Sequence, residues 1–312
     1  MSHATYECFK LLTHFSGWRY VLILQNYDVM TKTAYEIVSI LQTYGGANDI
    51  YAREADPRRW NHTLKWDAKA LKMFRDVLHA KPTQLTAKLK MAIGHVETSL
   101  SPAKLKMAIG HVETSLSRAA VDWMVKTADL TTLINQLNNN NFYGIDELFM
   151  ATLQVTEALE MPGGFTAKCI QHETVVPSFV KLVFWRGNPI EKYCQSKKWR
   201  HSVCVFGIKD FKTLATTSQF LANKVLPYFD YAVVDCLHEV IFNRTYLGQV
   251  DYDLNLDLYR KHAPTLYHEN LSHPDPNFKL NCSSFPNMRS GKEYKLFDLK
   301  IRKNFECDES RR

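Results

Sequence analysis

The first fifty residues combine an uninterrupted apolar run with a stretch of helical periodicity. Residues 20–24 are all hydrophobic, which is typical of a buried strand in a parallel sheet. After the polar residues 25–28, Thr33 and Glu36 have the spacing of a helix capping box, and the helical pattern continues to Gly45. Strand, polar loop and capped helix form the unit of an α/β sheet, whose ligands bind beyond the carboxyl ends of the strands.

The same patterns predict further elements along the chain. One helix is predicted to begin near Asp146, and the other predicted helices cover residues 63–78, 117–126, 129–137, 210–220 and 230–243. The predicted strands cover residues 179–185 and 202–206. From about residue 245 the chain is polar, so we interpret residues 246–312 as a C-terminal tail with little core of its own.

One segment of the sequence is duplicated. Residues 87–101 and residues 103–117 are identical, without a single mismatch. Two copies are too few for a solenoid, in which three or more repeats bury a shared core. We therefore expect one copy to occupy the native place in the fold and the other to loop out or pack poorly.

The composition is that of a folded protein. Of the 312 residues, 46% are hydrophobic and 23% are charged, which excludes a fully disordered chain. The net charge is +7, and the densest basic run, residues 197–201, indicates a local anion site rather than a nucleic-acid-binding stripe. The chain contains no run of about 18 apolar residues, so we expect no membrane span within it.

Cysteine and asparagine patterns bear on metal binding and on the cellular compartment. The seven cysteines include no C-x-x-C pair, and the histidines lack metal-binding spacing, so we expect no metal site. Four Asn-x-Ser/Thr sequons are a feature of secretory proteins; they lie at Asn61, Asn243, Asn270 and Asn281.

Two groups of charged residues are candidates for chemistry. Asp146 and Glu147 lie in the first turn of a predicted helix, where the helix dipole favours a carboxylate, and they are either a general base or helix caps. Arg200, His201 and Lys224 flank a predicted strand–helix unit. They either converge on a phosphate or diphosphate at one end of a sheet or form a solvated basic surface.

Asp28 and several aromatic residues leave similar alternatives open. Asp28 follows the first predicted strand, where many nucleotide-sugar enzymes hold a metal ion, but a single carboxylate is a poor site for a divalent cation. It belongs either to a donor-side loop or to a simple loop cap. The aromatic residues either stack on sugars or belong to the core; they are Trp60, Phe184, Trp185 and Trp199.

Several segments occur in an order that is specific to one family. These segments are WRYVLILQNYD (18–28), TAYEIV (33–38), GAND (46–49), LSRAAVDW (116–123), YGIDE (143–147), RHSVCVFG (200–207) and FLANK (220–224). Taken together, they resemble the core 2/I-branching β-1,6-N-acetylglucosaminyltransferases in their nematode-type form. The resemblance implies a GT-A-like (Rossmann-like) α/β domain over residues 1–245, with a mixed sheet flanked by helices. It also implies that the first strands of that domain are missing, together with an N-terminal anchor helix.

The resemblance also implies an activity. Members of this family transfer GlcNAc from UDP-GlcNAc to a glycan hydroxyl, with inversion and without a metal, and form β-1,6 branches on O-glycans. We therefore expect a glycosyltransferase without a cofactor, whose partners are a UDP-sugar donor and a glycan acceptor and not a nucleic acid. We expect it on the lumenal side of the Golgi membrane, attached only through the missing N-terminal anchor. The alternative is a catalytically inactive, truncated relative that binds glycans or has no function.

Donor-side and catalytic roles follow from the same resemblance. Glu147 matches the family's general base, and Lys224 matches the lysine that contacts the UDP diphosphate. The second diphosphate cation falls at His201, with Arg200 beside it, and the choice between the two stays open. Asp28 is assigned to the donor-side loop.

Acceptor-side roles are implied as well. Arg59 and Trp60 resemble the arginine and tryptophan of the family's acceptor loop. Phe184 falls where a tyrosine helps to hold the acceptor, and Leu182 replaces a tryptophan that would stack on it.

The cysteines also receive expectations from the resemblance. Cys194 and Cys204 are expected to form a disulfide bond that closes a short loop behind the basic cluster. Cys8 and Cys236 are expected to have lost partners upstream.

Overall fold

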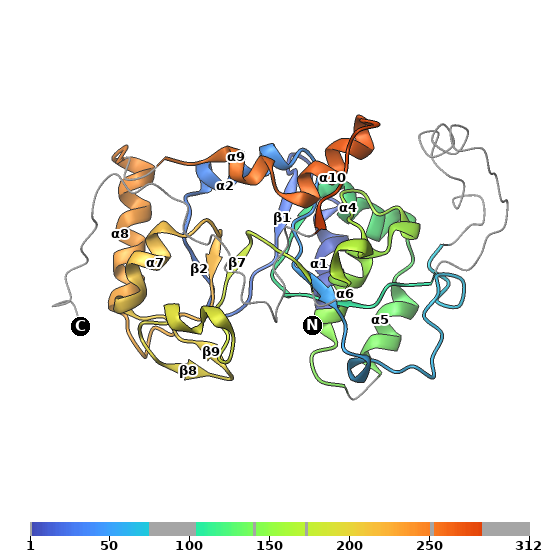
Figure 1. Cartoon of the computed structure of the whole chain (residues 1–312), viewed down its shortest axis with the longest axis horizontal. Helices are drawn as coiled ribbons and strands as arrows, with labels where there is room; N and C mark the ends of the chain where they lie inside the picture. The colour runs from blue at the N-terminus through green and yellow to red at the C-terminus, as the bar shows by residue number, and fades with distance from the viewer. Residues whose placement is uncertain (1, 75–103, 140–141, 172–173, 250–252, 283–312) are drawn as a thin grey trace.

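A computed structural model describes residues 2–74, 104–139, 142–171, 174–249 and 253–282 (Figure 1). The helices are α1 (Ser2–Leu12), α2 (Ala34–Tyr44), α4 (Arg118–Asp122), α5 (Thr131–Asn138), α6 (Asp146–Val155), α7 (Phe211–Thr216), α8 (Ala232–Tyr246), α9 (Leu256–Arg260) and α10 (Ala263–Ser272). The strands are β1 (Tyr20–Leu22), β2 (Val29–Met30), β3 (Ala52–Glu54), β4 (Ala108–Ile109), β5 (Ser115–Ser117), β6 (Val175–Val176), β7 (Lys181–Leu182), β8 (Trp199–Arg200), β9 (Val203–Cys204) and β10 (Leu221–Ala222).

The described strands form four small sheets instead of one continuous mixed sheet. β1 pairs with β5, β8 pairs with β9, and β3 lies between β4 and β6; all of these pairs are antiparallel. The remaining sheet has the order β2-β10-β7 and is mixed, because β10 is antiparallel to β2 and parallel to β7. The chain is therefore a mixed α/β protein.

The elements are arranged in two halves (Figure 1). One half contains β2, β7, β8, β9, α7 and α8, and the other contains α1, α4, α5 and α6. Helices α2 and α9 contact one another along one side of the molecule (Figure 1).

The apolar run at residues 20–24 differs from its prediction. Only Tyr20–Leu22 forms a strand; it is half-buried and pairs antiparallel with β5, so the prediction of a buried parallel strand is wrong. Alternate side chains of the run pack against two different hydrophobic clusters, Val21 against one and Tyr20 and Leu22 against another. An uninterrupted apolar sequence is required because both faces of this strand are covered.

Local capping signals predict the helices well. Glu36 N donates to Thr33 Oγ1 over 3.1 Å and Thr33 N donates to Glu36 Oε2 over 2.6 Å, which confirms the capping box of α2. Ser117 caps α4, and the predicted helix at Asp146 is confirmed as α6. The helix predicted from residue 63 is wrong over residues 63–74, which form turns, and residues 75–78 lie outside the described residues.

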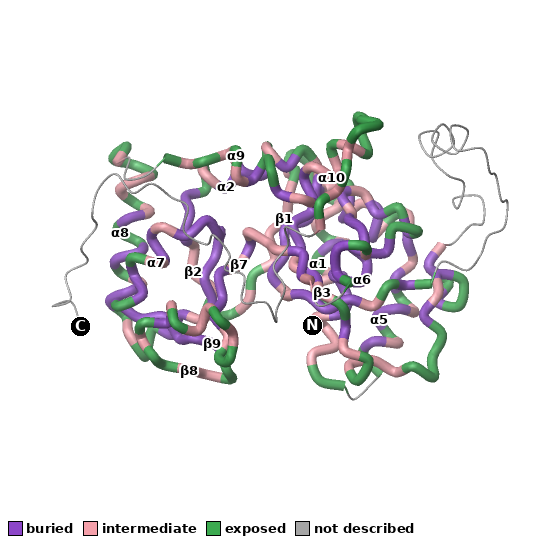
Figure 2. The backbone as a smooth tube through the Cα atoms, in the orientation of Figure 1, coloured by how far each residue is buried: buried purple, intermediate pink, exposed green. Residues whose placement is uncertain are grey.

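Each half has its own hydrophobic core, as the buried segments in Figure 2 show. A further cluster joins α2 to α9, where Tyr44, Phe220 and Tyr259 are almost fully buried. Residues 253–282 thus bury side chains against the domain, and a disulfide bond between Cys282 and Cys169 attaches their end to it. The division of the chain after residue 245 stays a prediction.

The second copy of the duplicated segment lies in the first core. It supplies β4 and β5, in which Ile109 is 2% exposed and Leu116 is fully buried. The first copy, residues 87–101, lies outside the described residues. A core position can hold only one of the two identical segments, because protein interiors are close-packed.

Substitution of Ile109 by alanine tests which copy the fold uses. We expect Ile109→Ala to lower the free energy of unfolding by about 2–5 kcal/mol, because it leaves a cavity in the core. Ile93→Ala changes the equivalent residue of the other copy and is the matched control, for which we expect a much smaller loss. Urea denaturation measures both, and equal losses would contradict the use of a single copy.

Candidate functional site

The edge of the mixed sheet gathers charged residues from distant parts of the chain. β7 and β10 are parallel, so their carboxyl ends, at Leu182 and Ala222, lie together, and Lys224 follows two residues after β10. Lys181 begins β7, opposite Leu221. β2 runs antiparallel to β10, so Asp28 precedes β2 at the same edge. Arg200 joins them from β8, and we call Lys181, Arg200 and Lys224 the cation edge. The pKa of Lys224 is lowered mainly by burial and further by the positive charges of Arg200 and Lys181.

Asp28 clamps the segment that carries Lys224. Its Oδ1 accepts a hydrogen bond from Asn223 Nδ2 over 2.7 Å, and its Oδ2 accepts one from Gln25 N over 2.7 Å. Tyr27 O accepts a further bond, of 3.0 Å, from the backbone N–H of Val225. Burial raises the pKa of Asp28 to about 6, against opposing hydrogen bonds. The structure therefore places Asp28 in contact with the segment that carries Lys224, as a support for it.

Arg200 and His201, the two cationic candidates of the β8–β9 hairpin, have different surroundings. Arg200 Nη1 donates to the hydroxyl of Tyr228 over 2.8 Å, and its Cζ lies 5.7 Å from the centre of the Tyr27 ring. His201 lies exposed in the turn, where it and Ser202 have positive φ angles. Arg200 is therefore the one that joins Lys224, whereas His201 stands at the tip of the hairpin.

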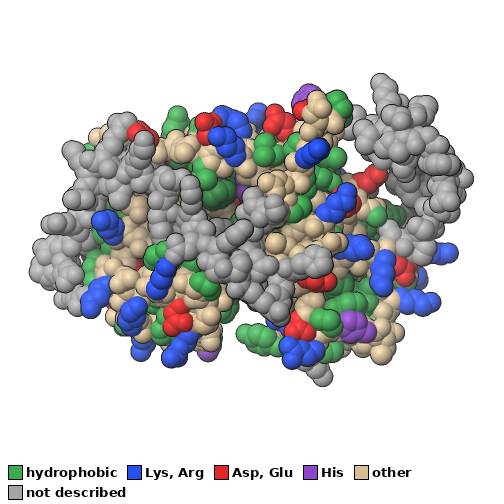
Figure 3. Space-filling model, viewed as in Figure 1, with side chains coloured by type: hydrophobic (Ala, Val, Ile, Leu, Met, Phe, Trp, Pro, Cys, Tyr) green, Lys and Arg blue, Asp and Glu red, His purple; other side chains and the backbone are tan. Residues whose placement is uncertain are grey.

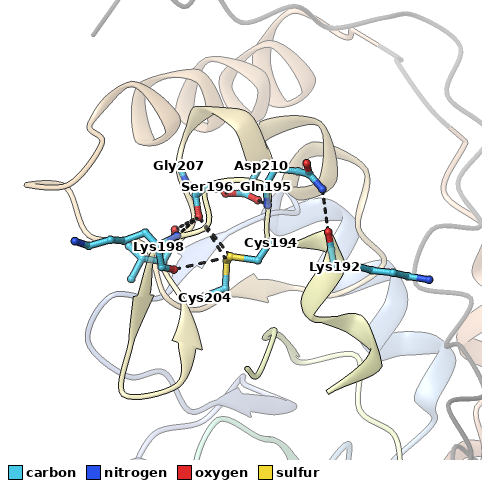
Figure 4. The surroundings of a disulfide bond; sticks show 9 residues. Lys192, Cys194, Gln195, Ser196, Lys198, Cys204, Gly207 and Asp210 are labelled. Carbon is cyan, nitrogen blue, oxygen red and sulfur yellow. Dashed lines mark hydrogen bonds between the residues drawn. A yellow bond between two sulfur atoms is a disulfide. The ribbon is translucent and has the colours of Figure 1, made fainter. Parts of the chain in front are cut away.

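A disulfide bond and a buried carboxylate hold the loop before this hairpin (Figure 4). The predicted bond between Cys194 and Cys204 is confirmed. Asp210 accepts hydrogen bonds from the backbone N–H groups of Gln195, over 2.7 Å, and Ser196, over 3.2 Å. The helix predicted over residues 210–220 is the shorter α7, which ends at Thr216, and the Asp210 side chain makes no capping bond to it.

The other cysteine expectations have different outcomes. Cys8 is free and exposed. Cys236 is disulfide-bonded, so the expectation that it has lost its partner is wrong.

Glu147 and Arg59 form an ion pair in the other half of the molecule. Arg59 Nη2 lies 2.8 Å from Glu147 Oε2 and 3.1 Å from the carbonyl oxygen of Gly144. The Glu147 side chain is 34% exposed, so solvent and ligands can reach it. A Cβ atom on Gly144 would lie 2.2 Å from Arg59 Nη2, so the pair requires glycine there. This glycine lies in the Tyr-Gly-Ile-Asp-Glu segment, in which the sequence analysis assigned a role only to the glutamate.

The predicted acceptor residues divide between the surface and the core. Trp60 is half-buried beside Arg59, with its ring 4.0 Å from that of His62. Phe184 is fully buried in the second core, where its ring lies 5.4 Å from that of Phe206. Leu182 is 1% exposed in the same core. Phe184 and Leu182 are therefore core residues, whereas Arg59 and Trp60 are partly exposed.

A short segment connects the two groups of charged residues. Gly110 N donates to the carbonyl oxygen of Glu147 over 2.8 Å, and Glu113 forms a 2.6 Å ion pair with Lys181. The three residues from Gly110 to Glu113 span at most about 10 Å, even when fully extended. Residues 110–113 therefore link the backbone of the base candidate to Lys181 of the cation edge. Neither Glu113 nor Lys181 was a candidate from the sequence, because no motif marks them and only the folded sheets bring them together.

The surface charge, the possible metal ligands and the possible membrane spans were compared with the predictions from the sequence. On the face drawn in Figure 3, lysine and arginine side chains are spread over both halves and are interspersed with acidic ones. Within the described residues there is no group of three or more His, Cys, Asp or Glu side chains that could hold a metal ion. In the same part of the chain, every helix is too short or too polar to cross a membrane.

These features define a mixed α/β protein in which a short segment links a sheet with several cations to a helix that begins with carboxylates. Comparison with known proteins assigns the family: the profile of the Core-2/I-branching enzymes matches residues 1–215. The chain belongs to this family.

Curated relatives carry names from the same family. A β-1,3-galactosyl-O-glycosyl-glycoprotein β-1,6-N-acetylglucosaminyltransferase from Bos taurus is 24% identical over 234 residues, which cover 72% of this chain and 49% of the relative. Two relatives with that name and the number 3 are 25% identical over 240 residues (Ovis aries) and 27% identical over 237 residues (Homo sapiens), with 74% of this chain and 49% of each relative covered. The chain spans about half the length of the curated relatives it matches.

Replacement of Asp28 by asparagine tests the environment of its carboxyl group. The folded-state pKa of about 6 lies above the ordinary value of 3.8, so the folded chain holds this proton more tightly than the unfolded chain does. The resulting stabilisation is full below the ordinary pKa and is lost as the pH rises through about 6. We therefore expect Asp28→Asn to become more stable relative to wild type as the pH rises from about 4 to about 6. Thermal denaturation measures the difference, and a pH-independent difference would contradict the raised pKa.

Proposed function

We propose that the chain is the catalytic part of an inverting, metal-independent glycosyltransferase that transfers GlcNAc from UDP-GlcNAc to a hydroxyl of a glycan. Family membership and the names of the relatives support the class of reaction. The observation that supports the proposal is that residues 110–113 link Lys181 of the cation edge to the backbone of Glu147. In the proposal these two groups belong to one GT-A-like domain of residues 1–245, followed by the tail of residues 246–312.

The cation edge is suited to a diphosphate leaving group. As the bond from the sugar to UDP breaks, negative charge develops on the diphosphate oxygens. Fixed cations stabilise that charge without having to reorganise, which is the service that a divalent metal supplies in other enzymes. Lys224 and Arg200 are the two cations of the proposal, and His201 stays beside them at the tip of the hairpin.

Glu147 is suited to the role of general base. It lies in the first turn of α6, where the helix dipole favours a carboxylate. Arg59 holds its Oε2, while its Oε1 has no hydrogen-bond partner among the described residues. The acceptor hydroxyl would give its proton to this oxygen as it attacks the anomeric carbon from the side opposite the diphosphate.

The acceptor would lie against the surface around Arg59. Trp60 and the 87%-exposed Tyr143 offer aromatic faces, and Arg59 Cζ lies 5.7 Å from the centre of the Tyr143 ring. Sugars stack on such faces, while the guanidinium can donate hydrogen bonds to hydroxyl groups. We propose a β-1,6 linkage to an O-glycan, as in the names of the relatives.

The compartment follows from the same proposal. Disulfide bonds persist in oxidising compartments, and this chain has Cys169–Cys282 and Cys194–Cys204. Together with the four sequons, they support a place in the secretory pathway, which we propose is the Golgi lumen. There the partners are the UDP-sugar and the glycan.

Substitution of Glu147 by glutamine tests the proposed base. We expect Glu147→Gln to reduce transfer to an O-glycan acceptor by at least about a hundredfold, because general-base catalysis contributes that much. UDP affinity should stay unchanged, since the diphosphate binds elsewhere. Asp146→Asn removes the neighbouring carboxylate of the same helix turn and is the matched control, for which we expect normal transfer.

The assay follows transfer from labelled UDP-GlcNAc, with and without EDTA. Transfer that persists in EDTA agrees with cations in place of a metal. Transfer that persists in Glu147→Gln would refute the base assignment, and UDP binding without any transfer by the wild-type chain would favour the non-catalytic alternative.

A further inference from the structure

Glu113 and Lys181 form a buried ion pair between the two halves of the molecule. Lys181 Nζ lies 2.6 Å from Glu113 Oε2, and the two side chains are 8% and 1% exposed. Glu113 belongs to the loop between β4 and β5, whereas Lys181 begins β7. Removing two charges from water is costly, and a buried pair repays that cost only when the remaining donors and acceptors are also satisfied.

This ion pair leaves some of its hydrogen-bond donors and acceptors without partners among the described residues. Glu113 Oε1 is buried without a hydrogen-bond partner among the described residues. A lysine ammonium has three donors, and the bond to Glu113 uses one of those of Lys181. A buried ion pair with spare donors and a spare acceptor is typical of a site that a polar ligand completes.

The position of the ion pair indicates the chemical class of this ligand. Lys181 begins β7, and the segment that carries Lys224 follows the adjacent parallel strand β10. The two strands stay paired up to that segment, because Asn223 N donates to Leu182 O over 3.0 Å. The charge of Lys181 acts on Lys224 and on Asp28, so all of them share one electrostatic environment. The negative charge of Glu113 acts on Lys224 in the opposite direction and raises its pKa. An anion that reaches Lys224 therefore also experiences Lys181.

We propose that Lys181 is a third cation of the diphosphate site and that Glu113 is its built-in counter-ion. The diphosphate of a nucleotide-sugar donor takes hydrogen bonds from the spare donors of Lys181, and the contact with Glu113 weakens in exchange. The pair holds the ammonium in place before the donor arrives, which reduces the entropy lost on binding. This inference rests on the proposed function, because it names a further residue of the same donor site.

Calorimetric titration of the full chain with UDP tests the inference. The variants are Lys181→Met, Glu113→Gln and the double variant Glu113→Gln/Lys181→Met. Lys224→Ala serves as the positive reference, and Lys209→Ala removes an exposed lysine of the same half as the matched control. We expect Lys181→Met to weaken UDP binding by about tenfold, the effect of losing a hydrogen bond to a charged group.

The counter-ion role predicts an opposite effect for Glu113. We expect Glu113→Gln to bind UDP as tightly as wild type or more tightly, because it frees the ammonium. A purely structural pair would instead weaken binding in both single variants, through a common loss of structure. Parallel weakening in the two would therefore overturn the inference.

A single variant can fail to fold because it leaves a buried charge unpaired. In that case the double variant tests the inference. It removes both charges and keeps the net charge, and apolar replacement of a buried pair is often tolerated. We expect it to bind UDP about fivefold or more weakly than wild type, since a direct phosphate contact is lost. Binding equal to wild type, or loss of folding, would assign the pair to the fold alone and overturn the inference. Absence of UDP binding by the wild-type chain would overturn the proposed function itself, which is a distinct result.

Discussion

The parallel pairing of β7 with β10 is the constraint on which the candidate site depends. These strands have only two residues each, and their register places Lys181 opposite Leu221, three residues before Lys224. The antiparallel partner β2 brings Asp28 to the same edge. The core of this half contains Phe184 and Phe206, so the backbone that presents the cations is supported by packed side chains. Like charges repel one another, so a cation edge of this kind depends on the rigidity of the sheet beneath it.

The second constraint joins this edge to the other half of the molecule. Residues 110–113 contact Glu147 at one end and Lys181 at the other. The segment belongs to the second copy of the duplicated sequence, whose apolar residues fill the first core. Placement of one copy in that core thus also sets the spacing between the proposed base and the proposed diphosphate site. Catalysis is sensitive to such spacing, since a displacement of about 1 Å can cost about a hundredfold in rate.

Sequence patterns identify the elements of this fold better than its pairings. The capping box at Thr33 depends only on local hydrogen bonds, and it was predictable. The strand at Tyr20–Leu22 was misread, because a run covered by two different clusters has the same composition as a buried parallel strand.

The candidate site shows the same division between local and non-local features. Glu147 could be named from its position at a helix start, but its partner Arg59 lies far away in the sequence, and only the structure reveals the contact. Phe184 could not be placed, because an aromatic residue in a strand faces either the core or a ligand, and that choice depends on tertiary packing. A crystal structure of the full chain with UDP is the most direct test of the central claim. We predict the diphosphate between Lys224 and Arg200, with the carboxylate of Glu147 facing the same opening. UDP bound away from these cations, or a Glu147 carboxylate turned away from it, would contradict the account.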